Sequence, residues 1–350
     1  HFWTDWFADL NYGPAAEAEK SDAFKALTSA ADKWINLGVD GFRLDAVKHI
    51  YHNAYSSENP MFLKKFYDRC NTTFKARGGN GDFYMVGEML DDCNKVAPYY
   101  AGLPALFEFS FWYKLKWALQ NNTGLYFAHD IISMQSAYSQ YRTDYIEATK
   151  LSNHDEDRAG SDLDKSKEKM KLAAAVLMTS QGHPYIYQGE ELGYWGTKSR
   201  GDEYVRAPII WDRSSTNTAT AGVNGKYDSG MLTKAMSVEA QSEDNNSVLS
   251  VYRYFTKLRN AHPALASGKM SKHPDYDENR QTDKNIAAWF IEGDGEKLLV
   301  VHNFGNTQYD AFFHEDLSQA VGLHGTASAY KTADTWKLTL GAYSSAIFKQ

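Results

Sequence analysis

The chain has 350 residues, of which 37 are basic and 44 are acidic, and its net charge is -7. This length accommodates one large domain and a smaller one. The acidic balance and the lack of a basic stripe argue against nucleic acid as a partner. No apolar run approaches the roughly 20 residues of a membrane-spanning helix, and the first residues do not resemble a signal peptide.

Aromatic residues make up 14% of the sequence, including 23 Tyr and 9 Trp. This abundance suits stacking against sugar rings, and it is equally typical of Tyr-rich cores and interfaces. The two cysteines, Cys70 and Cys93, share no short spacing with histidines that would indicate zinc. We expect both to be structural.

Helices and short apolar strands alternate through the first half of the chain. Helical spacing of Phe24, Leu27, Ala31, Trp34 and Ile35 predicts a buried face on a helix over 21–37, which Gly38 can end. Alternation of this kind is typical of parallel βα units. The further predicted helices are 61–74, one from 111 and 165–179, and the predicted strands are 39–45, 83–88, 105–109, 146–151 and 184–187.

The second half changes character twice. Residues 196–244 are polar and too long for a simple connection, so we expect them to be functional or disordered. A helix over 247–259 follows. Alternating strands then predict a separate β-sandwich, namely 286–291, 297–303, 311–314, 327–331 and 342–349.

Three carboxylates, Asp45, Glu88 and Asp155, each end a strand that we predict to be buried. A lone acidic residue at such a position is more often a helix cap or an ion-pair member. Three of them at the carboxyl ends of successive parallel strands would lie on one face of a barrel or open sheet, where an acid, a base and a charge stabiliser are needed.

The motifs around these carboxylates resemble the α-amylase family of glycoside hydrolases, and the resemblance extends from Phe7 to Lys349. The most specific motifs are the strand-end sequences that contain the three carboxylates. The matching segments are 41–49 (GFRLDAVKH), 86–88 (VGE), 151–155 (LSNHD), 7–11 (FADLN), 182–190 (GHPYIYQGE) and 206–211 (RAPIIW).

The resemblance implies a role for each strand-end residue. Asp45 would be the nucleophile, Glu88 the general acid and base, and Asp155 with His154 would hold hydroxyls of the sugar being cleaved. Arg43 lies two residues before Asp45, on the same side of the strand, and its permanent charge favours the ionised form of Asp45. The hydrophobic residues Met85 and Val86 favour the protonated form of Glu88.

The same resemblance implies further contacts. Ala46 and the pair Lys48 and His49 resemble members that cleave α-1,4 glucosidic bonds, with Lys48 and His49 lining the leaving-group side; a solvated helix start is an equally good interpretation of this pair. Arg206 is a further substrate-binding candidate. A calcium ion would use the backbone carbonyl of His49, with side-chain ligands mostly outside this chain.

The implied fold is the C-terminal part of a (β/α)8 barrel, strands 4 to 8, over residues 1–265, followed by a small all-β sandwich over 266–350. The family's Asp-x-x-x-Asn-His motif is missing, and a closed barrel needs eight strands. We therefore expect an N-terminal segment of the same enzyme to complete the barrel, and no amylase activity without it.

A second carbohydrate site is predicted on the helix that begins at Phe111. Its apolar stripe, Phe111, Leu115, Ala118 and Leu119, leaves Trp117 facing away from the core, and the turn at 121–124 brings Tyr126 and Asp130 nearby. These three residues can form a sugar platform. Packing against a neighbouring domain is the alternative interpretation.

The resemblance thus predicts an endo-acting, retaining α-glucan hydrolase for starch or maltodextrins in an extracellular or cell-surface setting. Closest are bacterial starch-utilisation amylases and neopullulanase-like enzymes. Alternatives are a transglycosidase, a neopullulanase or cyclomaltodextrinase, or a non-catalytic glycan-binding protein on a degenerate barrel. The expected partner is an α-glucan polysaccharide or oligosaccharide.

Overall fold

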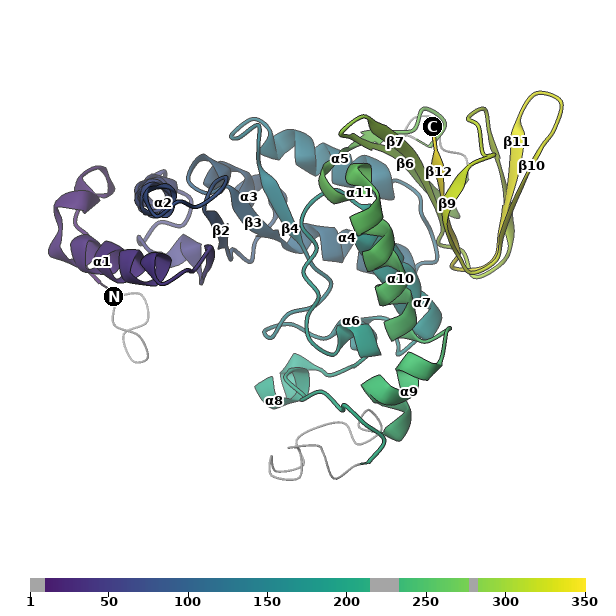
Figure 1. Ribbon diagram of the computed structural model, residues 1–350, viewed down its shortest axis with the longest axis horizontal. Coiled ribbons are helices and arrows are strands. Elements are labelled where there is room, and N and C mark those ends of the chain that lie inside the picture. Colours follow the sequence, from purple (N-terminus) through teal and green to yellow (C-terminus); the bar gives the residue numbers. More distant parts are fainter. Residues whose placement is uncertain (1–9, 215–232, 277–282) are drawn as a thin grey trace. The chain divides into compact units, whose positions relative to one another are not determined.

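A computed structural model describes residues 10–214, 233–276 and 283–350 (Figure 1). The chain divides into two compact units. Unit 1 comprises residues 1–110 and 133–148, and unit 2 comprises 111–132 and 149–350. Most of the 7–11 motif lies outside the described residues.

Unit 1 contains parallel strands that alternate with helices. Strands β1 (Gly41–Leu44), β2 (Tyr84–Gly87), β3 (Ala105–Glu108) and β4 (Ile146–Thr149) form one sheet in sequence order. The pairs β1–β2 and β2–β3 are parallel. Helices precede and follow β1, as the sequence predicts. The helices that precede β3 in the chain are η1 (Ala15–Lys20), α1 (Asp22–Asn36), η2 (Val47–His49), α2 (Glu58–Ala76), α3 (Cys93–Val96) and η3 (Ala97–Ala101).

Helix α1 ends as predicted, and its buried face is the predicted one except at Leu27 and Trp34. The Gly38 amide donates to Ile35 O and the Val39 amide to Trp34 O, and Gly38 has φ +112°, so the end is a Schellman motif. The buried stripe is Phe24, Thr28, Ala31 and Ile35. The prediction that Trp34 is buried is wrong: its exposed fraction is 54%.

The prediction that all three carboxylate-bearing strands are buried is wrong for β1. Strands β2 and β4 each have three buried residues, whereas every residue of β1 is partly or fully exposed. Strands β1 and β4 are the two edges of the described sheet. The bridge between Lys150 and Tyr185 extends the sheet beside β4, whereas β1 pairs only with β2 among the described strands, so β1 is the less covered edge.

In unit 2, helices α7 (Lys167–Thr179) and α10 (Val248–Ala261) lie side by side (Figure 1). The predicted strand at 184–187 is reduced to one parallel bridge between Lys150 and Tyr185. The described part of 196–244 carries short helices rather than plain loop. The remaining helices of this region are α4 (Phe109–Gln120), α5 (Phe127–Tyr138), α6 (Ala159–Asp162), η4 (Glu190–Leu192), η5 (Lys198–Arg200), α8 (Asp202–Val205), η8 (Lys234–Met236), α9 (Val238–Glu243) and α11 (Pro263–Ser267).

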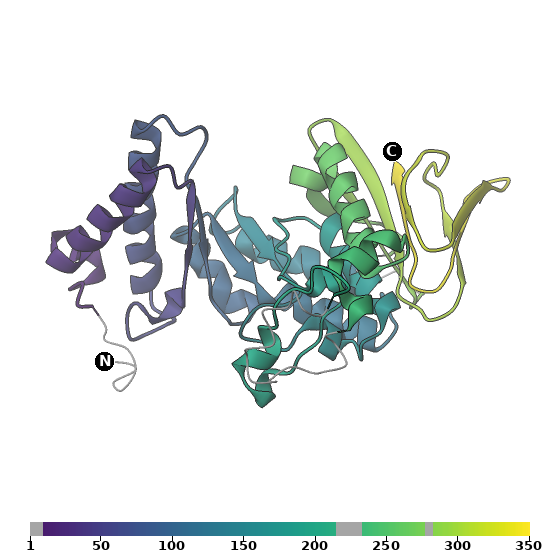
Figure 2. The ribbon, with the colours of Figure 1, turned by 60° about the horizontal axis from the view of Figure 1, so that its bottom comes forward.

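The last part of unit 2 is the predicted β-sandwich, which Figure 2 shows in green to yellow as two layers. One sheet has the order β5-β6-β7-β12-β9 and the other the order β10-β11-β8. Apolar residues of both sheets, including Phe290, Val301 and Phe313, form its core. Three strands, β5, β9 and β11, were not predicted. The bounds are β5 Lys269–Lys272, β6 Ile286–Gly293, β7 Glu296–Asn303, β8 Tyr309–Phe313, β9 Ala320–His324, β10 Ala327–Lys331, β11 Trp336–Leu340 and β12 Ser345–Lys349.

Candidate active site

Asp45 and Glu88 lie at the carboxyl ends of neighbouring strands, each one residue past its strand. The register pairs Leu44 with Gly87, and the Glu88 amide continues the ladder by donating to Leu44 O at 2.8 Å. Neighbouring strands lie about 4.8 Å apart. This backbone spacing suits a retaining pair, in which the two carboxyl groups are about 5 to 5.5 Å apart.

The segment after β1 holds Glu88 in place. The Ala46 amide donates to Glu88 Oε2 at 2.9 Å, and the Val47 amide donates to Glu88 O at 3.0 Å. Ala46 adopts the left-handed conformation, with φ 44° and ψ 47°, and so turns the chain immediately after Asp45. Gly87 permits close packing here, because a Cβ on it would lie 2.6 Å from Leu103 Cδ1.

Arg43 contacts Asp45 as the strand alternation predicts. The guanidinium Nη1 forms an ion pair and a hydrogen bond with Asp45 Oδ1. The Asp45 side chain is 78% exposed and that of Arg43 is 35% exposed, so the pair is open to solvent. Glu88 is only partly exposed.

Lys48 is engaged by the segment that follows Glu88. Its Nζ donates to Leu90 O at 2.7 Å and pairs with Asp91 Oδ2 at 3.2 Å. Asp91 is 10% exposed, and burial alone would raise its pKa. Hydrogen bonds from Lys95 and Lys48 outweigh that effect and lower the pKa of Asp91 to about 2. The sequence reasoning did not identify Asp91.

The third candidate cluster lies in unit 2. His154 Nε2 lies 3.0 Å from Asp155 Oδ2, and the Asn153 side chain accepts hydrogen bonds from the amides of Asp155 and Glu156. Arg206 Nη2 lies 3.1 Å from Asp155 Oδ1, and its Nε donates to His154 O. The Arg206 guanidinium thus contacts both a backbone atom and a side-chain atom of the motif.

Two residues that the sequence reasoning missed complete this cluster. Lys198 Nζ lies 3.3 Å from Asp155 Oδ1 and 2.6 Å from Asp202 Oδ1, and Arg206 also pairs with Asp202. The hydrogen bond from Lys198 lowers the pKa of Asp202. Lys198, Asp202 and Arg206 are spaced four residues apart, but they do not lie on one helix. Lys198 belongs to η5 and Asp202 begins α8, with Gly201 at φ +127° between them, so helical spacing did not indicate this cluster.

Trp117, Tyr126 and Asp130 are brought together as predicted. They line a cavity of about 290 Å³ together with Lys114, Ala118, Leu125 and Phe127. Trp117 is 56% exposed and Tyr126 is 43% exposed. Lys114 Nζ pairs with Asp130 Oδ2 at 2.7 Å. The cavity therefore has two accessible aromatic rings and an ion pair.

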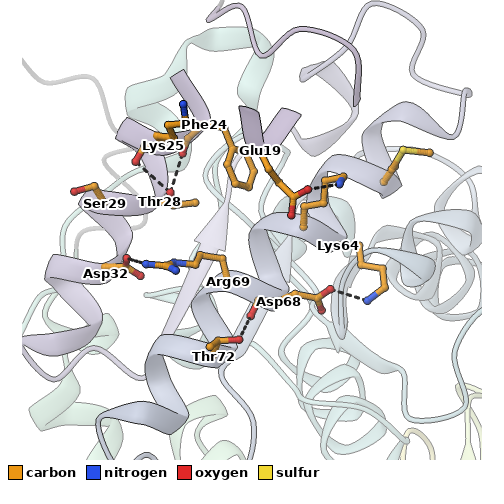
Figure 3. Close-up of a pocket in the computed structure, with 12 residues that line it drawn as sticks. Glu19, Phe24, Lys25, Thr28, Ser29, Asp32, Lys64, Asp68, Arg69 and Thr72 are labelled. Atoms are coloured by element: carbon orange, nitrogen blue, oxygen red, sulfur yellow. Dashed lines mark hydrogen bonds and ion pairs between the residues drawn. The ribbon is translucent and has the colours of Figure 1, made fainter. Parts of the chain in front are cut away.

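A larger cavity, of about 880 Å³, lies between α1 and α2 and contains none of the candidate residues (Figure 3). Its charged side chains pair with one another: Arg69 with Asp32, and Lys64 with Asp68 (Figure 3). These pairs link the two helices and the successive turns of α2. We regard this cavity as part of the helix packing.

No metal site is evident among the residues that the structure describes, since none of their His, Cys, Asp and Glu side chains form a group of three suited to an ion. Calcium at the backbone of His49 stays a prediction, and no chemical step is assigned to it. Cys70 and Cys93 are not joined by a disulfide, and burial raises the pKa of Cys70 to about 12. No helix in the described ranges has the length and apolar character needed to span a membrane.

Comparison with known proteins gives two family matches. Residues 4–268 match the α-amylase catalytic domain, and residues 286–347 match the C-terminal domain of α-amylase SusG. Over 350 residues the chain is 54% identical to α-amylase SusG of Bacteroides thetaiotaomicron, covering 100% of this chain and 50% of SusG. It is 31% identical to α-amylase 3 of Dictyoglomus thermophilum, covering 99% of this chain and 64% of that protein.

The solved structure of an α-amylase is also similar to this chain. An α-amylase from H. orenii superposes with a TM-score of 0.80 at 25% identity, covering 94% of this chain and 64% of that one. The present chain thus spans half to about two thirds of the length of these relatives. Because the α-amylase catalytic-domain model matches residues 4–268, which is most of the chain, this chain belongs to the α-amylase family.

Proposed function

We propose that this protein is a retaining α-glucan hydrolase of the α-amylase type, which cleaves α-1,4 bonds of starch or maltodextrins through a covalent glycosyl-Asp45 intermediate. The observation that carries the proposal is the position of Asp45 and Glu88, which follow β1 and β2 side by side at the carboxyl ends of these paired strands. The relatives described as α-amylases support the choice of substrate.

The two carboxylates divide the reaction between them. Glu88 protonates the glycosidic oxygen while Asp45 attacks the anomeric carbon, and Glu88 then takes a proton from the water that hydrolyses the intermediate. Arg43 stabilises the negative charge of Asp45 when the carboxylate is free. The amide of Ala46 holds the Glu88 carboxyl close to Asp45.

Sugar hydroxyls are the proposed ligands of the remaining candidates. His154 and Asp155 offer a ring nitrogen and a carboxylate, and Arg206 with Lys198 offers fixed donors beside them. His49 and Lys48 are assigned to the leaving-group side. Trp117, Tyr126 and Asp130 form a separate glucan-binding cavity. We also propose an extracellular or cell-surface location, which the resemblance to starch-utilisation amylases implies.

The test uses the full-length natural protein and soluble starch. Glu88→Gln should lower kcat by about 10² to 10⁴-fold, and Asp45→Asn should abolish turnover. Proton NMR should show that the first product has the α configuration. Asp68→Asn is the control, because Asp68 is an exposed carboxylate paired with Lys64 on α2; its activity should stay within about twofold.

Other results would favour the alternatives. Transfer products that dominate at high maltooligosaccharide concentration would indicate a transglycosidase, and preferred cleavage of pullulan or cyclomaltodextrins would indicate a neopullulanase or cyclomaltodextrinase. Binding of starch without any release of reducing ends would indicate a glycan-binding protein. An initial product of β configuration, or full activity of Asp45→Asn, would overturn the retaining mechanism.

A further inference from the structure

The segment between η2 and α2 forms a cavity of its own in unit 1. The cavity measures about 500 Å³ and is lined by Lys48, His49, His52, Asn53, Ala54 and Tyr55. It begins three residues after Asp45 in the sequence. Its walls therefore belong to the loop that leaves the carboxyl end of β1, where the proposed nucleophile is located.

Tyr55 presents an aromatic ring to solvent in this cavity, with an exposed fraction of 63%. Its hydroxyl donates to Asp91 Oδ2 at 3.2 Å, and Lys95 Nζ lies over the ring, 5.3 Å from its centroid. An exposed ring contributes little to a hydrophobic core. Two specific contacts nevertheless hold it in place and leave its face accessible to a ligand.

The backbone around Tyr55 is also fixed. The Tyr55 amide donates to Asn53 Oδ1 at 3.0 Å, and the hydroxyl of the buried Tyr99 donates to Ala54 O. Tyr99 also accepts a hydrogen bond from Asn59, which is fully buried and donates to Lys48 O as well. One buried pair, Asn59 and Tyr99, thus holds both the start and the end of the cavity wall.

Asp91 connects this wall to both proposed catalytic strands. It accepts hydrogen bonds from Lys48, which follows β1, and from Tyr55, and it lies three residues after Glu88. The Tyr55 ring is therefore held at a fixed position relative to the segments that carry Asp45 and Glu88. A ring fixed before binding loses little conformational freedom when a ligand stacks on it.

We propose that Tyr55, with the polar side chains of His52 and Asn53, forms a glucose-binding subsite for the part of the glucan beyond the cleaved bond. This inference rests on the proposed function. The apolar face of a pyranose stacks on the Tyr55 ring, and the hydroxyls at its edge meet the polar residues of the wall. Tyr55 then sets the preference for substrates long enough to reach it.

The experiment compares two substrates in the full-length natural protein. Maltoheptaose extends past the cleaved bond, whereas 2-chloro-4-nitrophenyl maltotrioside carries only an activated aryl leaving group there. Tyr55→Ala should lower the ratio of their kcat/KM values about tenfold, which corresponds to about 1.4 kcal/mol. Tyr55→Phe keeps the ring and should lower the ratio less than threefold. Tyr330→Ala removes another exposed tyrosine, on β10, and should leave the ratio unchanged.

Equal losses on both substrates, or no loss on either, would overturn the subsite. Circular dichroism and thermal unfolding confirm that each variant is folded. If the unmodified protein cleaves neither substrate, the proposed function fails, and titration with maltoheptaose then decides the subsite alone. Weaker binding by Tyr55→Ala than by the unmodified protein would support a glucan site at Tyr55, and equal or absent binding would refute it.

Discussion

Glu190 is buried, unlike Asp45 and Glu88 of the proposed catalytic pair. It is 5% exposed, and its Oε1 accepts a hydrogen bond from Tyr252 at 2.6 Å. Burial raises the pKa of Glu190 to about 7, although Tyr252 and Ser152 beside it lower it. Glu191 and Arg158 are the other charged groups that face it. Since Ser152 lies two residues before His154, Glu190 supports the segment that carries a substrate-binding candidate.

This burial predicts a pH-dependent stability. The ordinary pKa of the carboxyl is 4.5, so between pH 4.5 and about 7 folded Glu190 keeps a proton that the unfolded chain releases. Stability should therefore fall as pH rises through this window, by an amount on the order of 3 kcal/mol, and Glu190→Gln should remove this part of the slope. Denaturant unfolding between pH 4.5 and 8 measures it. Parallel curves for the two proteins would contradict the prediction, and Glu19→Gln, an exposed carboxylate paired with Lys65, is the control.

At single residues the sequence predicted contacts that one strand or one motif determines. Arg43 and Asp45 are two apart on β1, so their pairing follows from strand alternation. His154 and Asp155 are adjacent. The partners of Lys48, by contrast, are Leu90 and Asp91, more than 40 residues away. A long-range partner of this kind depends on the register between β1 and β2, which no local pattern contains.

At the scale of elements, the sequence predicted those with a strong local pattern. Strands β6 and β7 were found because each contains a continuous apolar run, 286–291 in β6 and 298–301 in β7. The structure explains the run in β6, since Phe290 faces the sandwich core while Trp289 packs against Phe127. Strand β11 was missed because only Leu338 and Leu340 are buried in it.

Helix α5 was overlooked although its sequence predicts it. Phe127, Ile131, Met134 and Tyr138 are spaced four, three and four residues apart, and all four are buried. The exposure of β1 is a different case, because it depends on which strands lie beside it. That information comes only from the assembled sheet.

Helix α4 allows its two faces to be tested against each other. Leu115 is fully buried, and Leu115→Ala should lower the free energy of unfolding by about 2 to 5 kcal/mol. Trp117 is exposed, and Trp117→Ala should change stability by less than about 0.5 kcal/mol while weakening binding to insoluble starch. Denaturant unfolding and starch sedimentation measure the two effects. Unchanged starch binding by Trp117→Ala would favour packing against a neighbouring domain.

At the scale of the whole molecule, the sandwich and the helical part of unit 2 share buried contacts. The Trp289 ring nitrogen donates to Thr179 O at 3.3 Å, and the Thr179 hydroxyl lies 3.0 Å from His302 Nε2. Thr179 ends α7, while Trp289 and His302 belong to β6 and β7. Burial lowers the pKa of His302 to about 3, so this junction contains a neutral imidazole.

The position of Trp289 leads to a prediction about cooperativity. Trp289 is fully buried, and Trp289→Ala should cost about 3 to 5 kcal/mol. Because its contacts reach both α7 and β7, hydrogen exchange should show that α7 and the sandwich strands lose protection together. Trp34→Ala, which removes an exposed tryptophan from α1, should change neither. The contrary result would be that, in Trp289→Ala, the sandwich strands lose protection from hydrogen exchange while α7 keeps the protection that it has in the unmodified protein. Residues 266–350 would then fold as the separate domain that the sequence predicts, and the contacts of Thr179 would only join two independently folding parts.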